Sequence, residues 1–85
     1  MNNIEQIVLQ AILEQNGLSE DEYHLESSFA YNGLESIDMV ETLIEIEDVL
    51  RIEGIGEVEL YSHDIGVHED NFYTLVKYVE GKVNE

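Results

Sequence analysis

Three stretches of the chain repeat their apolar residues at helical spacing, and this repeat limits the folds that the chain can adopt. In the first stretch, from about residue 3 to 15, the apolar residues follow the spacing i, i+3, i+4, i+7, i+8 and are Ile4, Ile7, Val8, Ala11 and Ile12. This spacing predicts a helix with one apolar face. Asn2 or Asn3 can cap its start, and Asn16-Gly17 offers a left-handed stop at its end.

The second predicted helix begins at Ser36 and ends at about Leu50 or Arg51. At about 100° per residue, one broad arc of this helix holds the apolar residues; they are Ile37, Val40, Leu43, Ile44, Ile46 and Leu50. Four carboxylates gather outside the arc, and they are Asp38, Glu41, Glu45 and Asp48. Glu47 falls inside the apolar arc, where we expect it at the edge, within reach of Arg51 one turn later.

The third predicted helix covers the C-terminal part of the chain. Its apolar residues repeat at helical spacing and are Phe72, Leu75, Val76, Val79 and Val83. Glu69, Asp70 or Asn71 can form its start. Lys77 and Lys82 lie toward its C-terminal end, where the helix dipole favours positive charge.

Two long connections separate these helices. Residues 18–35 show no sustained period but contain scattered apolar side chains, so we expect them to pack over the bundle, with one short turn formed by a capping box from Ser19 to Glu22. Gly54, Gly56 and Gly66 interrupt residues 51–68. Residues 57–60 alternate like a strand, but they have no partner strand, so we expect a loop or a short helical turn there.

The apolar stripes of the three helices are wide enough to be buried only against one another, and 44% of the residues are hydrophobic. We therefore predict an all-α fold, a small bundle of three to four helices with a long first loop. A chain of 85 residues is too short for a second core, so we expect residues 1–85 to form a single domain.

The charge of the chain excludes several classes of function. Asp and Glu account for 20 residues, whereas Arg51, Lys77 and Lys82 are the only Lys or Arg residues, and the net charge is −17. Binding to nucleic-acid phosphates or to an anionic membrane surface needs more positive charge. No apolar run approaches the roughly 20 residues of a membrane span, and the start of the chain does not resemble a signal peptide. We expect a cytoplasmic monomer with basic partners.

Catalysis and metal binding are also not expected. The chain contains no Cys, which excludes a thiolate metal site and a Cys nucleophile. His24, His63 and His68 lie in loop-like segments without the i, i+4 pairing of a helical metal site, so we interpret them as surface residues. A small bundle also leaves little room for the desolvated pocket that a general acid needs. We therefore predict that the chain is not an enzyme.

The stretch from Asn32 to Glu41 places Ser36 at the junction between a loop and a helix. One role for such a Ser is structural, because its hydroxyl can cap the helix amides, worth about 1 kcal/mol. The same position exposes the hydroxyl where a helix N-terminus favours an attached phosphate. From the spacing alone, both roles stay open.

The acidic ridge of the second helix starts two residues after Ser36. Its neighbouring carboxylates repel one another at a cost of roughly a few tenths of a kcal/mol per pair. In so acidic a chain, such a ridge is compatible with a solvated surface that has no partner. A ridge of one sign beside an exposed Ser is also what a docking surface for basic proteins requires.

The sequence Gly33-Leu34-Glu35-Ser36-Ile37, followed by acidic residues through Leu50, resembles the acyl carrier proteins. Their signature is Gly-x-Asp-Ser-Leu before an acidic second helix, and the closing segment from Asn71 to Val79 is also similar to theirs. The resemblance implies that a phosphopantetheinyl transferase attaches a 4′-phosphopantetheine arm, taken from coenzyme A, to Ser36 as a phosphodiester. The thiol of that arm would hold acyl groups as thioesters for loading and processing enzymes of fatty-acid, polyketide or related synthesis.

The resemblance also implies a partner-docking face around the second helix, opposite basic patches on those enzymes. The residues assigned to it are Glu35, Ile37, Asp38, Met39, Glu41, Glu45 and Asp48. Three features depart from the family pattern. Glu35 replaces the usual Asp, which is expected to weaken recognition by the transferase or to require a dedicated one. The usual Ile-Pro after the second helix is missing, and residues 51–70 are longer than usual.

Two other functions are compatible with these residues. In one, the chain is an unmodified acidic interaction module that keeps the carrier fold, and Glu35 marks the loss of modification. In the other, the chain carries aminoacyl or peptidyl groups, although Leu34 and Glu35 differ from the Gly-Gly-x-Ser common in peptidyl carriers. In either kind of carrier, the partner enzymes choose the cargo.

Overall fold

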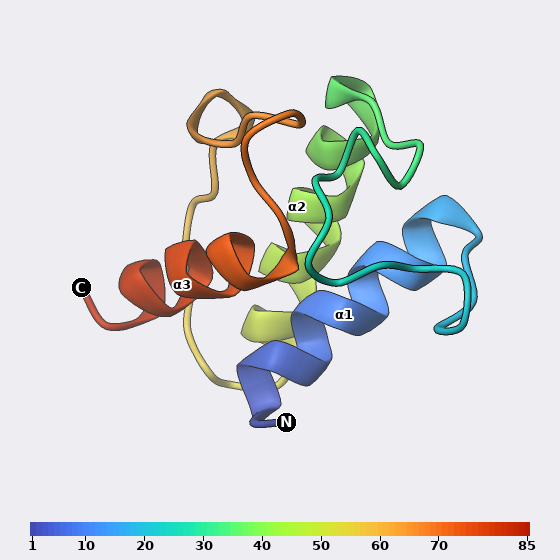
Figure 1. Ribbon diagram of the computed structural model, residues 1–85. Coiled ribbons are helices and arrows are strands. Elements are labelled where there is room, and N and C mark those ends of the chain that lie inside the picture. Colours follow the sequence, from blue (N-terminus) through green and yellow to red (C-terminus); the bar gives the residue numbers. More distant parts are fainter.

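The computed structural model describes residues 1–85 and contains three α-helices, one short 3₁₀ helix and no β-strand. The elements are α1 (Asn3–Asn16), α2 (Ser36–Ile52), η1 (Ser62–Asp64) and α3 (Phe72–Val83). Figure 1 shows α1 and α2 running in roughly opposite directions, with α3 packed against α1. The predicted all-α bundle is therefore confirmed, with three α-helices. None of its helices is both long and apolar enough to cross a membrane.

Helix α1 has the two ends that its sequence predicts. The Asn2 side chain accepts a hydrogen bond from the Glu5 amide (2.8 Å), and the Glu5 carboxylate accepts one from the Asn2 amide (3.0 Å). At the other end, Gly17 adopts a left-handed conformation with φ 64°, and its amide donates to the Leu13 carbonyl. Both ends are determined by local hydrogen bonds, which is why the sequence predicts them.

Helix α3 begins with a similar reciprocal cap. The Asn71 side chain accepts from the Thr74 amide (3.0 Å), and the Thr74 hydroxyl accepts from the Asn71 amide (2.9 Å). Of the three residues that the sequence offers for this start, Asn71 is the cap. The start of the predicted third helix is therefore confirmed.

The first connection packs over the bundle, as predicted, because its apolar side chains enter the core. Tyr23, Phe29 and Leu34 are all buried together with residues from the three helices. The core consists of Val8, Leu9, Ala11, Ile12, Tyr23, Phe29, Leu34, Met39, Leu43, Ile46, Leu50, Leu60, Phe72, Leu75, Val76 and Val79. Near the start of this connection, the backbone amide and hydroxyl of Ser19 donate to the Glu22 carboxylate, which lowers the pKa of Glu22. The predicted turn is present.

The buried side of α2 differs from the predicted apolar arc. Ile37 and Ile44 were assigned to that arc, but their side chains are 61% and 53% exposed. Met39 and Thr42 are buried instead. The apolar residues of the first connection also pack on the core, so helical periodicity within α2 does not by itself decide which side is covered. The prediction that Ile37 and Ile44 belong to the buried apolar arc was therefore wrong.

Thr42 is the one buried polar residue, and its hydroxyl is fully used. It donates to the Asp38 carbonyl (2.8 Å) and accepts from the side-chain amide of Asn16 (3.2 Å). These bonds remove the cost of burying a hydroxyl and join the end of α1 to the first half of α2.

The second connection, residues 53–71, is irregular except for η1, which agrees with the predicted loop or short helical turn. It is attached to α2 through Glu47, whose carboxylate accepts from the buried amide of Leu60 (2.6 Å). The predicted contact of Glu47 with Arg51 is wrong, because Arg51 pairs with Asp48 (3.3 Å). Figure 1 shows this connection, in yellow to orange, reaching the end of the molecule where α2 begins.

Candidate functional site

The two connections meet beside the start of α2. The Ala30 amide donates to the Val67 carbonyl (2.8 Å), and the Phe29 amide donates to the Asp70 carbonyl (3.1 Å). Since these bonds join segments far apart in the sequence, they hold both connections against the N-terminal end of α2. The same end of the molecule contains Ser36.

Asn32 fixes the shape of the first connection before Ser36. Its side chain accepts from the His24 amide (2.8 Å) and donates to the carbonyls of His24 and Ser28 (both 3.0 Å). Gly33 follows with φ 84°, a left-handed conformation that favours glycine. Leu34 is then buried in the core. This sequence of an anchored Asn, a turning Gly and a buried Leu leads the chain directly into α2.

Ser36 is the first residue of α2 and is exposed to solvent. Its hydroxyl makes no hydrogen bond within the protein, so the structure does not support capping, one of the two roles left open for Ser36. The cap position belongs to Glu35, and the Asp38 carboxylate accepts from the Glu35 amide (2.8 Å). The Asp38 carboxylate thus bonds the amide of the residue before Ser36, and the Ser36 hydroxyl has no partner in the protein. The first amides of a helix have no carbonyl partners within it, and they favour a nearby anion.

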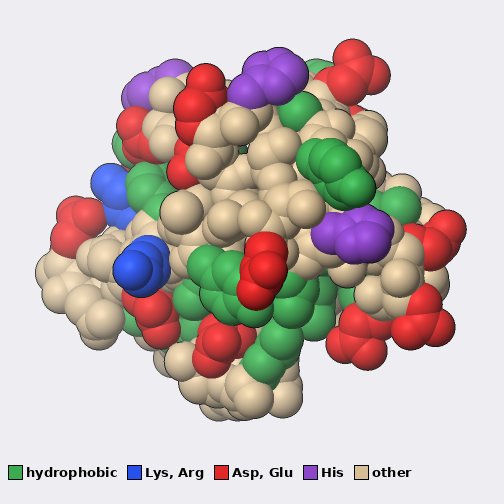
Figure 2. Space-filling view, in the orientation of Figure 1, with side chains coloured by type: hydrophobic (Ala, Val, Ile, Leu, Met, Phe, Trp, Pro, Cys, Tyr) green, Lys and Arg blue, Asp and Glu red, His purple; other side chains and the backbone are tan.

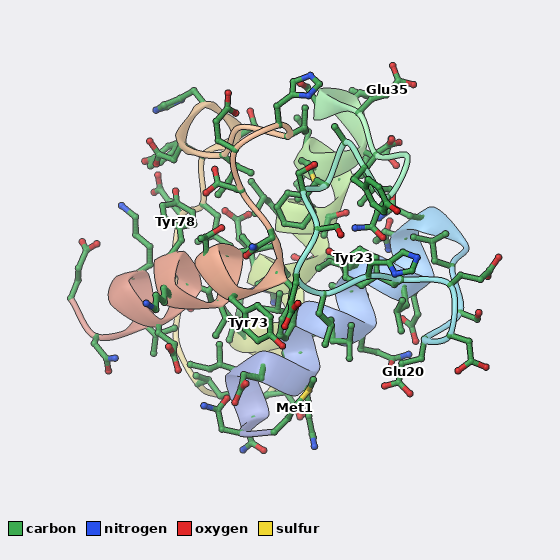
Figure 3. The ribbon with its side chains drawn as sticks, viewed as in Figure 1. Met1, Glu20, Tyr23, Glu35, Tyr73 and Tyr78 are labelled. Carbon is green, nitrogen blue, oxygen red and sulfur yellow. The ribbon has the colours of Figure 1, made fainter.

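An open hollow of about 600 Å³ adjoins Ser36. Both connections and the first turn of α2 line it, and the lining residues are Ala30, Gly33, Leu34, Glu35, Ser36, Ile37, Val67 and His68. Half of these residues are apolar, and none is Lys or Arg. Figure 3 shows Glu35 at the free end of α2, directed away from the body of the protein. The hollow thus offers a long, partly apolar molecule contact with the protein surface beside an exposed hydroxyl.

Six of the seven residues assigned to the partner-docking face reach the surface. Glu35, Ile37 and Glu41 are exposed. The other three, Asp38, Glu45 and Asp48, are half-buried. Met39 is the exception.

Met39 does not belong to that face, because its side chain is only 1% exposed. It shares a side of α2 with Leu43 and Ile46, four and seven residues later, and both of these are buried in the core. The assignment of Met39 to the docking face is therefore wrong.

Ile44 is a surface residue that sequence reasoning placed in the core. It lies two turns after Ile37, so both isoleucines are on one side of α2, with Glu41 between them. We call the surface formed by Ile37, Asp38, Glu41, Ile44, Glu45 and Asp48 the exposed face of α2. The seven-residue spacing of the two isoleucines is a signal for this face, but the same spacing also fits a core position, and only packing distinguishes the two.

Electrostatics differ along the exposed face of α2. Asp48 is paired with Arg51, and Asp38 is engaged at the helix start. Glu41 and Glu45 make no ion pair within the protein, so their charges are available to a partner. Figure 2 shows acidic side chains around the outline of the molecule, while the Lys and Arg side chains visible in this view gather on one side.

The three His residues are exposed, as expected for surface residues. His24 lies edge-on to Tyr31, and His63 stacks on Tyr61 with ring centroids 5.4 Å apart. His68 lines the hollow beside Ser36. No three His, Asp or Glu side chains are placed to hold a metal ion.

The geometry thus singles out one exposed hydroxyl, one adjoining hollow and one acidic helix face. We compared the chain with protein-family models, with curated proteins and with solved structures, and no match was found in any of the three comparisons.

Proposed function

We propose that the protein is a carrier that bears a phosphopantetheine arm on Ser36 and presents acyl thioesters to partner enzymes. The observation that carries this proposal is the Ser36 hydroxyl, exposed on the first turn of a 17-residue helix and free of hydrogen bonds within the protein. A hydroxyl that is neither buried nor used as a cap is accessible to a modifying enzyme. The residues around it, Gly33 to Glu41, are those that resemble the acyl carrier signature.

The residues around Ser36 fit such an arm. The amides of the first helical turn favour the negative charge of a phosphodiester. Leu34, Ile37 and Val67 supply apolar contacts in the adjoining hollow for the uncharged part of the arm. When bound, the group supplies a thiol, which this chain does not have because it contains no Cys. Ser36 would hold the arm, and the hollow would support the part nearest the protein.

Attachment needs only coenzyme A and a transferase. A bond forms between the Ser36 oxygen and the phosphorus that carries pantetheine, while the bond between the two phosphates of coenzyme A breaks. Adenosine bisphosphate leaves, and the transferase accepts the proton of the Ser36 hydroxyl. Catalysis belongs to that partner, and we propose no catalytic role for this chain.

We expect basic patches on the transferase and on the acyl-processing enzymes to contact the exposed face of α2. Glu41 and Glu45 supply unpaired charge there, and Ile37 and Ile44 supply apolar area. Charge contributes mainly to the rate and specificity of association, whereas buried apolar side chains contribute more to affinity. Glu41 is therefore expected to affect association, and Ile37 to affect dissociation.

Intact-mass measurement tests the proposal. The wild-type protein is incubated with coenzyme A and a transferase of broad specificity, and we expect the mass gain of one phosphopantetheine. Ser36→Ala should abolish the gain. Ser62→Ala is the matched control, because Ser62 is also exposed at the start of a helical element, η1, and its variant should be modified like the wild type.

Glu35→Asp extends the same experiment. It restores the family's usual residue before Ser36, and we expect it to speed up modification. If neither the wild type nor Glu35→Asp gains mass, the carrier proposal is wrong. If Ser36→Ala still gains mass, the assignment of the site is wrong.

One observation favours a second candidate, an unmodified acidic interaction module. The exposed face of α2 combines two isoleucines with free carboxylates, which is sufficient for docking without any arm. If this candidate is correct, the protein binds basic partners, and neither the wild type nor Glu35→Asp gains mass. An aminoacyl or peptidyl carrier would instead gain mass, and the thioester recovered from its native cell would identify the cargo.

A further inference from the structure

A second surface depression lies between α1 and α2, away from Ser36. It has a volume of about 670 Å³ and is open to solvent along one side. Its lining comes mainly from α1 and from the second half of α2, and consists of Met1, Asn3, Gln6, Ile7, Leu9, Gln10, Ala11, Glu14, Glu20, Glu45, Val49, Glu53 and Ile55. We call this depression the α1–α2 groove. It shares no lining residue with the hollow at Ser36.

The floor of the α1–α2 groove is apolar. Leu9 and Ala11 are buried, whereas Ile7, Val49 and Ile55 are half-buried and keep part of their surface in contact with water. Covering such surface releases about 25 cal/mol for each Å² removed from water. The floor can therefore contribute affinity for an apolar side chain that enters from solvent.

The rim of the groove has one sign of charge. Glu14, Glu20, Glu45 and Glu53 lie around it, and no lining residue is Lys or Arg. Helices α1 and α2 run in roughly opposite directions (Figure 1), so Glu14, near the end of α1, and Glu53, just after α2, lie toward opposite ends of the groove. Helix α1 itself contains no basic residue. The rim thus surrounds an apolar floor with four carboxylates, none of which forms an ion pair with Lys or Arg.

We propose that the α1–α2 groove binds a basic amphipathic helix of a partner protein. The apolar side of such a helix would cover Ile7, Val49 and Ile55, and its Lys or Arg residues would face the carboxylates of the rim. A second copy of this chain does not fit, because it too has a net charge of −17 and only three Lys or Arg residues. The proposal is independent of any modification at Ser36.

The length of the groove sets the size of a suitable probe. Helix α1 has 14 residues. At about 1.5 Å per residue it is ~21 Å long, so a peptide helix of about 18 residues would span the groove. We choose a synthetic peptide with Leu at helical spacing along one side and Lys on both flanks. A second peptide of the same composition, with the Leu residues scattered around the helix, is the control for charge alone.

Binding is mapped by NMR on isotope-labelled, full-length protein. We expect the amide shifts caused by the peptide to concentrate in α1 and in the part of α2 from Glu45 to Glu53. The peptide with scattered Leu should bind much more weakly. Concentration of the shifts around Ile37 and Ile44, equal binding of the two peptides, or absence of binding would each overturn the proposal.

Paired charge reversals separate the rim from the overall charge. Glu20→Lys with Glu53→Lys changes two exposed rim carboxylates, whereas Glu26→Lys with Glu57→Lys changes two exposed carboxylates elsewhere, so both variants have the same net charge. We expect the rim variant to weaken binding about tenfold or more, and the control variant to weaken it less than about threefold.

Equal weakening by the two variants would mean that only the total charge matters and would contradict the assignment of the rim. Ser36→Ala should leave peptide binding unchanged. Failure of this proposal is therefore distinguishable from failure of the carrier proposal, which depends on the mass gained at Ser36.

Discussion

Tyr23 lies almost entirely inside the protein, with 6% of its surface exposed, and its hydroxyl has no hydrogen-bond partner. Figure 3 shows this residue where the first connection passes over α1. Burial raises the pKa of Tyr23 far above its ordinary value of 10.0. A buried hydroxyl without a partner costs free energy on folding, so the ring stabilises the core while its oxygen opposes that gain.

We predict that Tyr23→Phe raises the free energy of unfolding by about 1 kcal/mol at neutral pH, since the variant keeps the ring and removes the unpaired oxygen. Urea unfolding measures the change. Tyr31→Phe is the control. The Tyr31 side chain is 70% exposed, so removing its solvated hydroxyl should change the free energy of unfolding little. A less stable Tyr23→Phe variant would show that the hydroxyl does contribute to the fold.

The same substitution has a consequence for pH. Because the folded state raises the pKa of Tyr23, its contribution is fully present below the unfolded value near 10.0 and is lost as the pH rises above it, when only the unfolded chain releases the proton. Tyr23→Phe should therefore lose stability less steeply than the wild type above pH 10.0. Some alkaline loss should remain, because the pKa values of Tyr61 and Tyr78 are also raised.

Ser36 illustrates which properties of a single residue can be predicted from the sequence. The exposed position of Ser36 follows from a local pattern, because a loop ends and a helix begins there. That its hydroxyl makes no hydrogen bond does not follow, because the residue that accepts a bond at this helix start is Asp38, from the Glu35 amide (2.8 Å). Ser and Asp are both common near helix starts, and the sequence does not decide which of them satisfies the backbone.

At the scale of elements, the side chain of Tyr78 joins α3 to the second connection. Its hydroxyl donates to the Asp64 carboxylate (2.6 Å) and accepts from the Tyr61 amide (3.0 Å). Burial and the bond to Asp64 raise the pKa of Tyr78. Lys82 lies 5.8 Å from the centre of the same ring. These contacts hold η1 against α3.

We predict that Tyr78→Phe lowers the free energy of unfolding by about 1–2 kcal/mol, because two hydrogen bonds are lost and the Tyr61 amide loses its acceptor. Amide hydrogen exchange should become faster at residues 61–65, while α1 keeps its protection. Tyr73→Phe is the matched control, since Tyr73 also lies on α3, on the other side in Figure 3, and its hydroxyl bonds to no protein group. Equal destabilisation by both variants would contradict the role of the Tyr78 hydroxyl.

The helices were easier to predict than the connections for a physical reason. The ends of α1 and α3 depend on caps within three or four residues, such as Asn2 with Glu5 and Asn71 with Thr74. The second connection is instead held by partners 13 and 17 residues away, through Glu47 and Tyr78. A carboxylate that falls inside an apolar arc, as Glu47 does, is a signal of such a contact, but it does not identify the partner.

At the scale of the whole molecule, negative charge opposes the compact state. The net charge is −17. Of the three Lys and Arg residues, only two form ion pairs, Arg51 with Asp48 and Lys82 with Glu85. The molecule measures 31 × 25 × 19 Å. At about 0.01 M salt the screening length is roughly 30 Å, so charges across the whole molecule repel one another, whereas at about 0.1 M it is only ~10 Å.

We predict that the melting temperature rises as NaCl is raised from about 0.01 M to 0.1 M and then changes less, since screening removes most long-range repulsion over that interval. Circular dichroism at neutral pH measures the transition. Near pH 4.1, where the net charge approaches zero, the same addition of salt should have little effect. A melting temperature that falls with salt at neutral pH would indicate that attractive pairs outweigh the repulsion.

The bundle as a whole was predictable, because in so short a chain each of the three apolar stripes can be buried only against the other helices. The covered side of α1 agrees with its predicted apolar face. Which side of α2 remains uncovered was not predictable, because residues of the first connection, Phe29 and Leu34, also pack in the core. The α1–α2 groove is a product of that packing. It therefore becomes visible only in three dimensions.

The separation of the groove from the Ser36 hollow has a consequence for the order in which partners act. A protein anchored in the groove by one helix would leave the Ser36 end open, so a second protein would not have to wait for the first to depart. An enzyme domain joined to that anchoring helix by a flexible segment would meet Ser36 at an effective concentration on the order of millimolar. Such tethering would let an enzyme that binds Ser36 only weakly act there repeatedly before the tethered partner diffuses away.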